Sequence, residues 1–234
     1  MPRAAEYLSD FPLFAGLDEE ESRLIASVAK RKTYPPRHLI SLEGAVTDFF
    51  GIVTAGLIKG VNYSAEGREF LIDFHIPGEL VGEFSITSEI EFPCDFVAVE
   101  ESEIVFVRRN SMAELARKNG MIALRLATAS SLRMMRLHRR LKSVALDRGP
   151  ERIHAFLTEM ALRVGTSTDG GMLVDLTLSH QMLADACGLS RETVSRLMAD
   201  LVRNGSLQKR ASGWMLKTPD RRVVSPGLDP LGVQ

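Results

Sequence analysis

The sequence has few cysteines and no long apolar run, and each of these features excludes whole classes of protein. Only Cys94 and Cys187 occur among 234 residues, far apart, so neither a disulfide framework nor a four-cysteine metal site is expected. No uncharged apolar stretch is long enough to span a bilayer, and residues 1–15 lack the basic start and apolar run of a signal peptide. We therefore expect a cytoplasmic protein with no membrane partner.

Histidines are also too few and too scattered for a metal-dependent enzyme of the cupin type. Such a β-roll needs a His-x-His pair, a following Glu and a later His as metal ligands. The candidate β region contains only His38 and His75, which stand well apart. We therefore predict a protein that is not an enzyme, with no catalytic residues, no metal site and no cofactor.

The formal net charge of −1 conceals an uneven distribution of charge along the chain. Residues 1–110 contain 10 Lys and Arg against 19 Asp and Glu, residues 111–147 contain 8 against 2, and residues 148–222 contain 11 against 8. An acidic front with a basic rear is typical of a protein whose rear part faces phosphate groups. An Arg-rich helix face in contact with water would give the same distribution, so charge alone leaves both interpretations open.

The first half of the chain has the pattern of a small helix followed by a β-roll. Residues 18–29 predict an amphipathic helix capped by Asp18. Short β-rich runs then alternate with turn signals such as Ala55-Gly56 and Pro77-Gly78, which predicts an antiparallel roll or barrel. The expected strands cover residues 39–42, 49–54, 57–62, 70–76, 96–99 and 104–107.

Residues 119–146 predict a long helix that pairs with a second copy of itself. Seven positions follow one another at steps of three and four residues: Leu124, Ala127, Ser131, Met134, His138, Leu141 and Ala145. At ~1.5 Å per residue the helix would run roughly 40 Å, too long for one small core to cover. Burial against the protein's own roll is the alternative, but that would not need so sustained a repeat. We predict a homodimer through these seven seam positions.

The region after residue 147 has the pattern of a winged helix-turn-helix. Asp147-Arg148-Gly149-Pro150 breaks the long helix, and residues 151–164 predict an amphipathic helix. A short strand over residues 172–176 follows. Ser179 then caps a helix, Cys187-Gly188-Leu189 makes a tight turn and Ser190 caps a second helix.

The second of these two helices, residues 191–203, is the expected recognition helix, and residues 207–210 and 213–217 are the expected hairpin wing. Four residues in its first two turns are expected to reach base edges in the major groove: Arg191, Glu192, Ser195 and Arg196. A helical hairpin with ordinary surface ion pairs is the alternative for this segment alone. The domain organisation expected is a β-roll sensor over residues 1–118, a dimerisation helix and hinge over 119–147, the winged helix-turn-helix over 148–222, and a flexible tail over 223–234.

Together these segments resemble the Crp-Fnr family of bacterial transcription factors, named for the cyclic-AMP receptor protein and the fumarate-nitrate reductase regulator. The motifs that carry the resemblance are Glu43-Gly44, Gly56, Glu66-Gly67-Arg68-Glu69, Pro77-Gly78-Glu79-Leu80, Gly82-Glu83, Leu178-Ser179-His180-Gln181 and residues 188–197. The resemblance implies an α+β fold: a cyclic-nucleotide-binding-type antiparallel β-roll, a long dimerisation helix and a C-terminal winged helix-turn-helix. It also implies double-stranded DNA, a second copy of the chain and RNA polymerase as partners.

The resemblance further implies where an effector would bind, and which one is excluded. In the family the Gly-Glu pair holds the ribose of cyclic AMP, and Gly82-Glu83 matches it. Phe92-Pro93 align with the Arg-Ser pair that binds the phosphate, and Arg136-Leu137 align with the residues that contact adenine. A buried phosphate without a cationic partner costs several kcal/mol. We therefore expect an effector other than cyclic AMP, in a pocket formed by Gly82, Glu83 and Arg136.

Other modes of control stay open at this point. The protein could act without an effector and be controlled by its abundance. A haem sensor would need axial ligands such as His75 and Cys94, and a thiol redox sensor would use Cys187 or Cys94. An iron–sulfur cluster is excluded because the N-terminal cysteines that hold it in relatives are absent.

The expected operator follows from the chemistry of the recognition helix and from the resemblance. Glu192 can accept from a cytosine amino group, and Arg196 can donate twice to a guanine. The family's half-sites imply a shared GA core and the inverted repeat TGTGA-N6-TCACA or a close variant. Phosphate contacts are expected from Ser179, Gln181, Ser190, Thr193 and Arg210.

Overall fold

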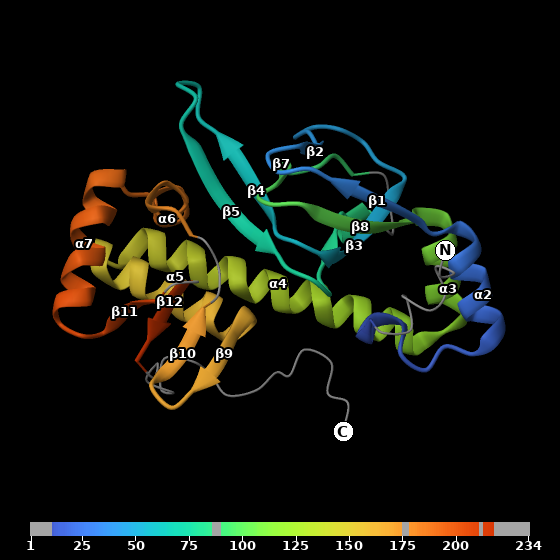
Figure 1. Ribbon diagram of the computed structural model, residues 1–234. Coiled ribbons are helices and arrows are strands. Elements are labelled where there is room, and N and C mark those ends of the chain that lie inside the picture. Colours follow the sequence, from blue (N-terminus) through green and yellow to red (C-terminus); the bar gives the residue numbers. More distant parts are fainter. Residues whose placement is uncertain (1–10, 86–89, 175–177, 211–212, 218–234) are drawn as a thin grey trace. The chain divides into compact units, whose positions relative to one another are not determined.

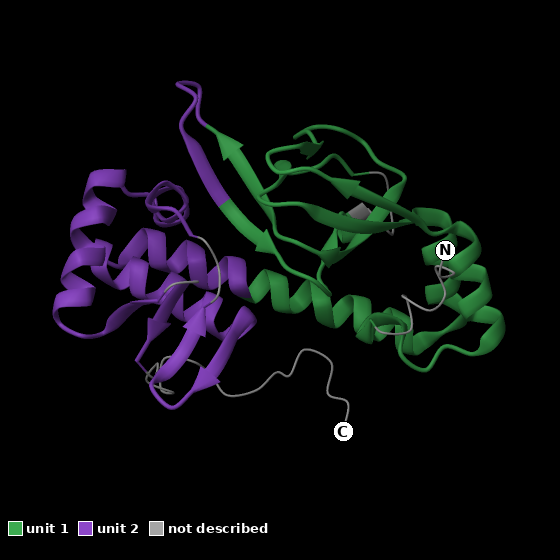
Figure 2. Ribbon diagram, viewed as in Figure 1, with its two compact units in different colours: residues 1–63, 72–135, 228–234 green, residues 64–71, 136–227 purple. Residues whose placement is uncertain are grey.

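The computed structural model describes residues 11–85, 90–174, 178–210 and 213–217, which fall into two compact units (Figure 2). One unit contains the described residues within 11–63 and 72–135, and the other contains those within 64–71 and 136–217. The division falls within the long helix α4 (Gly120–Leu146). The domain boundaries expected at residues 118, 147 and 222 therefore stay predictions, and the expected tail over 223–234 lies outside the described residues.

Two four-stranded antiparallel sheets form the β-roll, in the orders β1-β8-β3-β6 and β2-β7-β4-β5 (Figure 1). The strands are β1 (Lys30–Tyr34), β2 (Leu39–Ser41), β3 (Phe49–Ala55), β4 (Ile58–Tyr63), β5 (Glu69–His75), β6 (Leu80–Val81), β7 (Asp95–Ala98) and β8 (Ser102–Arg108). Every strand expected from the sequence is present, with ends shifted by one or two residues. The turn at Gly56 needs glycine, because its φ is +81° and a Cβ there would lie 2.3 Å from the carbonyl oxygen of Glu101.

Alternating apolar residues of the strands build two clusters of buried side chains. One cluster draws on both sheets and includes Val53, Ile58, Phe96 and Ile104. The other joins β3 and β8 to the helices of this unit, which are η1 (Pro12–Phe14), α2 (Glu19–Val28), α3 (Arg109–Lys118) and the first turns of α4. The short helix η2 (Glu83–Ser85) follows β6.

Helix α2 begins as the sequence predicts, with a reciprocal cap. Asp18 Oδ1 accepts from the backbone N–H of Glu21 at 2.8 Å, and Glu21 Oε2 accepts from that of Asp18 at 3.1 Å. Neither α3 nor the charged strand β1 was expected from the sequence.

The second unit contains the winged helix-turn-helix. Its elements are α5 (Gly149–Val164), β9 (Gly165–Thr168), β10 (Gly171–Val174), α6 (His180–Cys187), α7 (Arg191–Arg203), β11 (Leu207–Arg210) and β12 (Gly213–Leu216). The four strands form an antiparallel sheet in the order β11-β12-β10-β9. The end of the strand expected over 172–176 lies outside the described residues. The predicted fold class, a β-roll with a long helix and a winged helix-turn-helix, is confirmed.

Candidate nucleic-acid interface and sensor site

The turn between α6 and α7 is held by caps at both of its helices. Ser179 Oγ accepts from the backbone N–H of Met182 at 3.1 Å, and Ser190 Oγ accepts from that of Thr193 at 3.2 Å. Gly188 ends α6 in the left-handed conformation, with φ of +63°, which favours glycine. Both predicted caps are confirmed, and they set the direction in which α7 leaves the turn.

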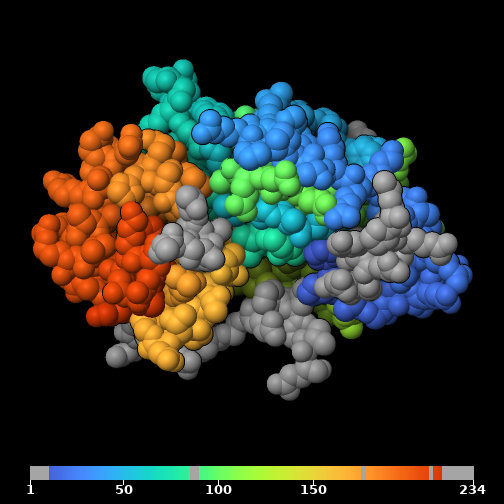
Figure 3. All heavy atoms as spheres, in the orientation of Figure 1, coloured from blue at the N-terminus to red at the C-terminus, as the bar shows by residue number. Residues whose placement is uncertain are grey.

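Helix α7 has a buried face and an exposed face. Val194 and Met198 are buried within the second unit, where Leu183 and Ala184 of α6 are also buried. On the other face all four expected base-reading residues are exposed: Arg191, Glu192, Ser195 and Arg196. Figure 3 shows α7, in orange, with its side chains at the surface of this unit. The helix thus presents cationic, anionic and hydroxyl groups to a partner.

The charge of Glu192 suits it to accept a hydrogen bond from DNA. A hydrogen bond from its own backbone N–H, together with one from Ser190, lowers the pKa of Glu192 below its ordinary value. The side chain is therefore an anion at neutral pH, and it presents only acceptor oxygens.

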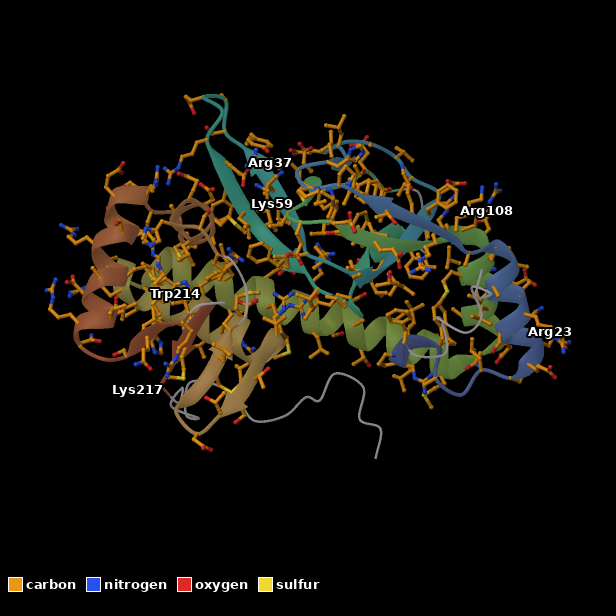
Figure 4. The ribbon with its side chains drawn as sticks, in the orientation of Figure 1. Arg23, Arg37, Lys59, Arg108, Trp214 and Lys217 are labelled. Carbon is orange, nitrogen blue, oxygen red and sulfur yellow. The ribbon has the colours of Figure 1, made fainter. Side chains whose placement is uncertain are left out.

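The residues expected to contact phosphate flank this face, and several already have partners within the chain. Ser190 and Thr193 form the cap of α7, with their hydroxyl oxygens 3.0 Å apart. Gln181 Nε2 donates to Asp185 Oδ1 at 2.7 Å. Arg210 is exposed at the end of β11, in the wing that also carries Trp214 and Lys217 (Figure 4).

The seam of α4 is exposed along its whole length in the single chain. All seven seam positions are exposed, and Leu124, Met134 and Leu141 reach 60%, 66% and 70%. On another face of the same helix, Ile122 and Leu126 are buried in the core of the roll. One helix therefore packs on its own roll and also leaves an apolar ridge uncovered.

The roll contains a buried ionic cluster that α4 completes. Arg133 Nη1 lies 2.7 Å from Glu83 Oε1, and Arg133 Nε lies 3.8 Å from Asp73 Oδ2. The three side chains are 11%, 7% and 3% exposed, respectively. Burial alone would lower the pKa of Arg133, but Glu83 and Asp73 outweigh it and raise that pKa above its ordinary value. Arg133 is therefore a cation, and its contacts with Glu83 and Asp73 lie within this unit.

Arg133 is a cation that binds Glu83, and the expected pocket residue Arg136 stays a prediction. Arg136 belongs to the second compact unit, where it lines a cavity. Arg133 was not among the residues expected in this region, although the sequence contains a signal for it. Arg133 stands seven residues after Leu126 and eleven after Ile122, so it continues the buried face of α4 rather than its seam.

Phe92 is the residue that the resemblance led us to expect in place of the family's phosphate-binding arginine. The ring is buried and makes edge contacts with Phe84 and Phe96, at centroid distances of 5.4 and 5.3 Å. A Cβ on Gly82 would lie 3.4 Å from the Phe92 ring, so the ring stands directly against the Gly82-Glu83 turn. A packed aromatic ring cannot donate a hydrogen bond to a phosphate.

The thiols and His75 are all buried. Burial raises the pKa of Cys94 and that of Cys187 to about 11 in each case. His75 Nδ1 lies 2.8 Å from the carbonyl oxygen of Leu80. Within the described parts of the chain, no three His, Cys, Asp or Glu side chains are grouped to hold a metal ion, and no helix is long and apolar enough to cross a membrane.

Comparisons with known proteins match both halves of the chain. Residues 31–119 match the cyclic nucleotide-binding domain, and residues 151–222 match the Crp-like helix-turn-helix domain. The chain is 31% identical over 194 residues to the cyclic AMP receptor protein of Thermus thermophilus, covering 83% of this chain and 87% of that protein. The chain belongs to the Crp/Fnr family of transcription regulators.

A second curated relative agrees with this membership, and a solved structure agrees with the fold. This regulator is 32% identical over 169 residues to the nitrogen fixation regulation protein FixK of Rhizobium meliloti, covering 72% of this chain and 74% of that protein. The structure of FixK2 from Bradyrhizobium japonicum superposes with a TM-score of 0.73 at 22% identity, covering 84% and 96% of the two chains, and supports the fold. This regulator therefore has a helix-turn-helix DNA-binding domain, and its relatives are not enzymes.

Proposed function

We propose that this regulator binds, as a homodimer, to an inverted repeat close to TGTGA-N6-TCACA. The observation that carries the proposal is the exposed face of α7, where Arg191, Glu192, Ser195 and Arg196 stand together at the capped start of the helix. Arg196 donates twice to a guanine edge and the ionised Glu192 accepts from a cytosine amino group. Recognition helices related by two-fold symmetry lie about 34–36 Å apart, which sets the half-site spacing.

The phosphate backbone positions the dimer on its site. These contacts come from the exposed residues Ser179, Gln181 and Ser190 near the two caps, from the half-buried Thr193, and from the exposed guanidinium of Arg210 in the wing. Gln181 must leave Asp185 to do so. Contacts of this kind add affinity without reading sequence.

The exposed seam of α4 supports the homodimer. Leu124, Met134 and Leu141 form an apolar ridge at heptad spacing, and a second copy of the same helix covers it with matching side chains. The two-fold axis of that pair is the symmetry of the palindrome. RNA polymerase is the further partner through which a DNA-bound regulator changes transcription.

Control by a small effector other than cyclic AMP is part of the proposal, because Phe92 packs against Gly82 where a phosphate would need a cation. The relatives' names do not share one signal, since one is a cyclic AMP receptor protein and another a nitrogen fixation regulation protein. The second candidate is a regulator that needs no effector. The Arg133–Glu83 pair favours it, since the carboxylate expected to bind an effector already has a cationic partner.

Selection of DNA from a random pool by the purified full-length protein tests the proposed operator. We expect a symmetric repeat with a GA core in each half-site. A pool that converges on an asymmetric site, or on none, contradicts the proposal.

Two measurements then separate the two modes of control. Mass spectrometry of small molecules released on denaturing freshly purified protein identifies a retained effector. Tight operator binding by ligand-free protein, unchanged by any compound of a metabolite panel, favours the effector-independent regulator.

A further inference from the structure

The second unit contains a cavity of about 300 Å³ whose lining is strongly cationic. It is lined by the last three turns of α4, the body of α5 and the end of α6. Its basic side chains are Arg136, Arg139, Arg140, Lys142, Arg152 and Arg163. Asp147 and Glu159 are the only acidic residues in that lining. An excess of positive charge around a small hollow attracts an anion.

Two of the cations in this lining, Arg140 and Arg152, contact uncharged groups, whereas Arg163 Nη1 pairs with Glu159 Oε1 at 3.2 Å. Arg140 Nη2 donates to the carbonyl oxygen of Ala186 at 2.9 Å, and its guanidinium lies over the Phe156 ring, 5.3 Å from the centroid. Arg152 donates to the carbonyl oxygens of Asp147 and Cys187, at 2.9 and 3.3 Å. Carbonyls and aromatic faces carry no net charge, so these contacts orient the guanidinium groups of Arg140 and Arg152 without themselves neutralising them.

Two hydroxyl groups in the lining lack a hydrogen-bond partner among the residues that the structure describes. Thr158 Oγ1 and Ser143 Oγ are buried, and neither makes a hydrogen bond; Thr158 as a whole is only 3% exposed. A buried polar group without a partner is destabilising, and such groups are rare in folded proteins. A hydroxyl donates readily to an anionic oxygen, so both groups complement the surrounding cations.

We propose that this cavity binds a small anion with at least two negative charges, carried by phosphate or by several carboxylates. Planar guanidinium groups bind both kinds of anion through paired hydrogen bonds. The volume is at the lower end of the ~300–1,000 Å³ typical of ligand pockets, which suits a compact metabolite. This site is separate from the Gly82-Glu83 region expected from the family's motifs.

The bound anion would bias the orientation of the recognition helix. Arg140 and Arg152 connect the cavity to the carbonyls of Ala186 and Cys187, which directly precede the turn into α7. An anion bridging these arginines ties the end of α4 to that turn. It changes DNA affinity only if it binds the DNA-competent arrangement more tightly than the others. Binding of the anion itself does not depend on the proposed operator.

Calorimetric titration of the full-length protein with inorganic pyrophosphate and with citrate, at fixed ionic strength, tests the site. We expect saturable binding of at least one probe, and the probe that binds identifies phosphate or carboxylate as the preferred chemistry. Replacing two exposed lining cations, Arg139→Gln with Lys142→Gln, should weaken that binding about tenfold or more, since each loses a charge-assisted contact. Arg148→Gln is the matched control, because Arg148 is exposed and lies outside the lining; it should change affinity less than about twofold.

A second variant keeps every charge. Thr158→Val has nearly the same shape and removes the unpartnered hydroxyl, so it should raise the melting temperature of the ligand-free protein and weaken anion binding. A merely structural role for Thr158 would not combine these two effects.

Three results would overturn the site. The first is no saturable binding of either probe at fixed ionic strength. The second is an equal loss in the Arg148→Gln control, which would indicate general charge attraction. The third is unchanged anion binding with weaker, less salt-dependent binding to all DNA in the Arg139→Gln, Lys142→Gln variant, which would assign these cations to DNA phosphates.

Discussion

The helix-turn-helix and the β-roll differ in how their functional side chains are placed. In α7 the residues expected to read DNA are exposed, and the helix itself is held by buried residues such as Val194 and Met198. In the roll, Glu83 and Asp73 are buried and face Arg133. An external partner can reach the first set directly, whereas an effector reaches the second only by competing with an ion pair.

Helix α4 shows both kinds of placement within one element. Its seam residues Met134 and Leu141 are exposed, whereas Arg133, the direct neighbour of Met134 in sequence, is only 11% exposed. Consecutive residues on a helix stand about 100° apart. Substitutions on the two faces should therefore have different effects. Those on the exposed seam should separate the two copies of the chain, and those on the buried face should destabilise the roll.

The largest effect, on dimerisation and operator affinity, is expected from substitutions in the seam. Met134→Glu with Leu141→Glu places charge on the apolar ridge without touching the core of the protomer, since both side chains are more than 60% exposed there. Sedimentation should show a folded monomer. Operator affinity should fall by about 100-fold or more, because two half-sites no longer act together.

Met121→Glu is the control for the seam, since Met121 is an exposed methionine of the same helix that lies outside the seven positions. It should remain a dimer. A double variant that stays dimeric and binds the operator normally would refute the seam.

The next effect in size is expected in the roll. Arg133→Met leaves Glu83 and Asp73 buried without their shared cation, which should cost about 3–5 kcal/mol in urea unfolding. Combining it with Glu83→Gln should recover part of that loss. Arg117→Met, at an exposed cation of α3, should stay within about 0.5 kcal/mol. Equal losses in the two arginine variants would show that the buried cluster has no special role.

A smaller effect is expected for the base contact of Arg196. Arg196→Ala should cost about 1–3 kcal/mol per half-site and relax the preference for one guanine, as measured with operators substituted at single positions. Arg203→Ala is the control on the same helix, where Arg203 Nη1 pairs with Asp200 Oδ1 at 3.1 Å. If both variants lose affinity alike and keep the base preference, Arg196 does not read sequence.

Replacing Arg210 in the wing should weaken DNA binding without changing the base preference, unlike replacing Arg196. Arg210→Ala should weaken binding to all sequences to a similar degree and lower the salt slope by about one per half-site, because one phosphate contact is lost. Arg23→Ala makes the same change in charge at an exposed residue of α2 in the other unit (Figure 4), and it should leave the slope unchanged. A slope that does not respond to Arg210→Ala argues against this contact.

Local signals predicted the helix-turn-helix well, because each of its determinants acts within a few residues. Ser179 and Ser190 cap helices through hydrogen bonds three residues along the chain, and Gly188 needs only its own backbone freedom. Strand β1 escaped the sequence analysis because its three leading residues are charged. It lies at the edge of its sheet and pairs only with β8, a position where charged residues are common.

The sensor region was predicted less well because its contacts join distant parts of the chain. Arg133 and Glu83 are 50 residues apart, and nothing near either residue indicates the other. The same holds for the cationic cavity, whose lining comes from three helices. Burial patterns along α4 can nominate Arg133 as an inward residue, but they cannot name its partner.

The smallest effect on operator affinity is expected from modifying the two thiols. This test distinguishes buried structural cysteines from a redox sensor. Burial raises the pKa of Cys94 and of Cys187 to about 11, so at pH 8 only about one thiol in a thousand is the reactive thiolate. Mild peroxide should leave operator affinity unchanged, and iodoacetamide should label neither residue until urea unfolds the protein. Thiolate forms as pH rises toward that pKa, so labelling of the folded protein should increase with pH. Rapid labelling at pH 7, or loss of DNA binding that a reductant reverses, would establish a thiol sensor.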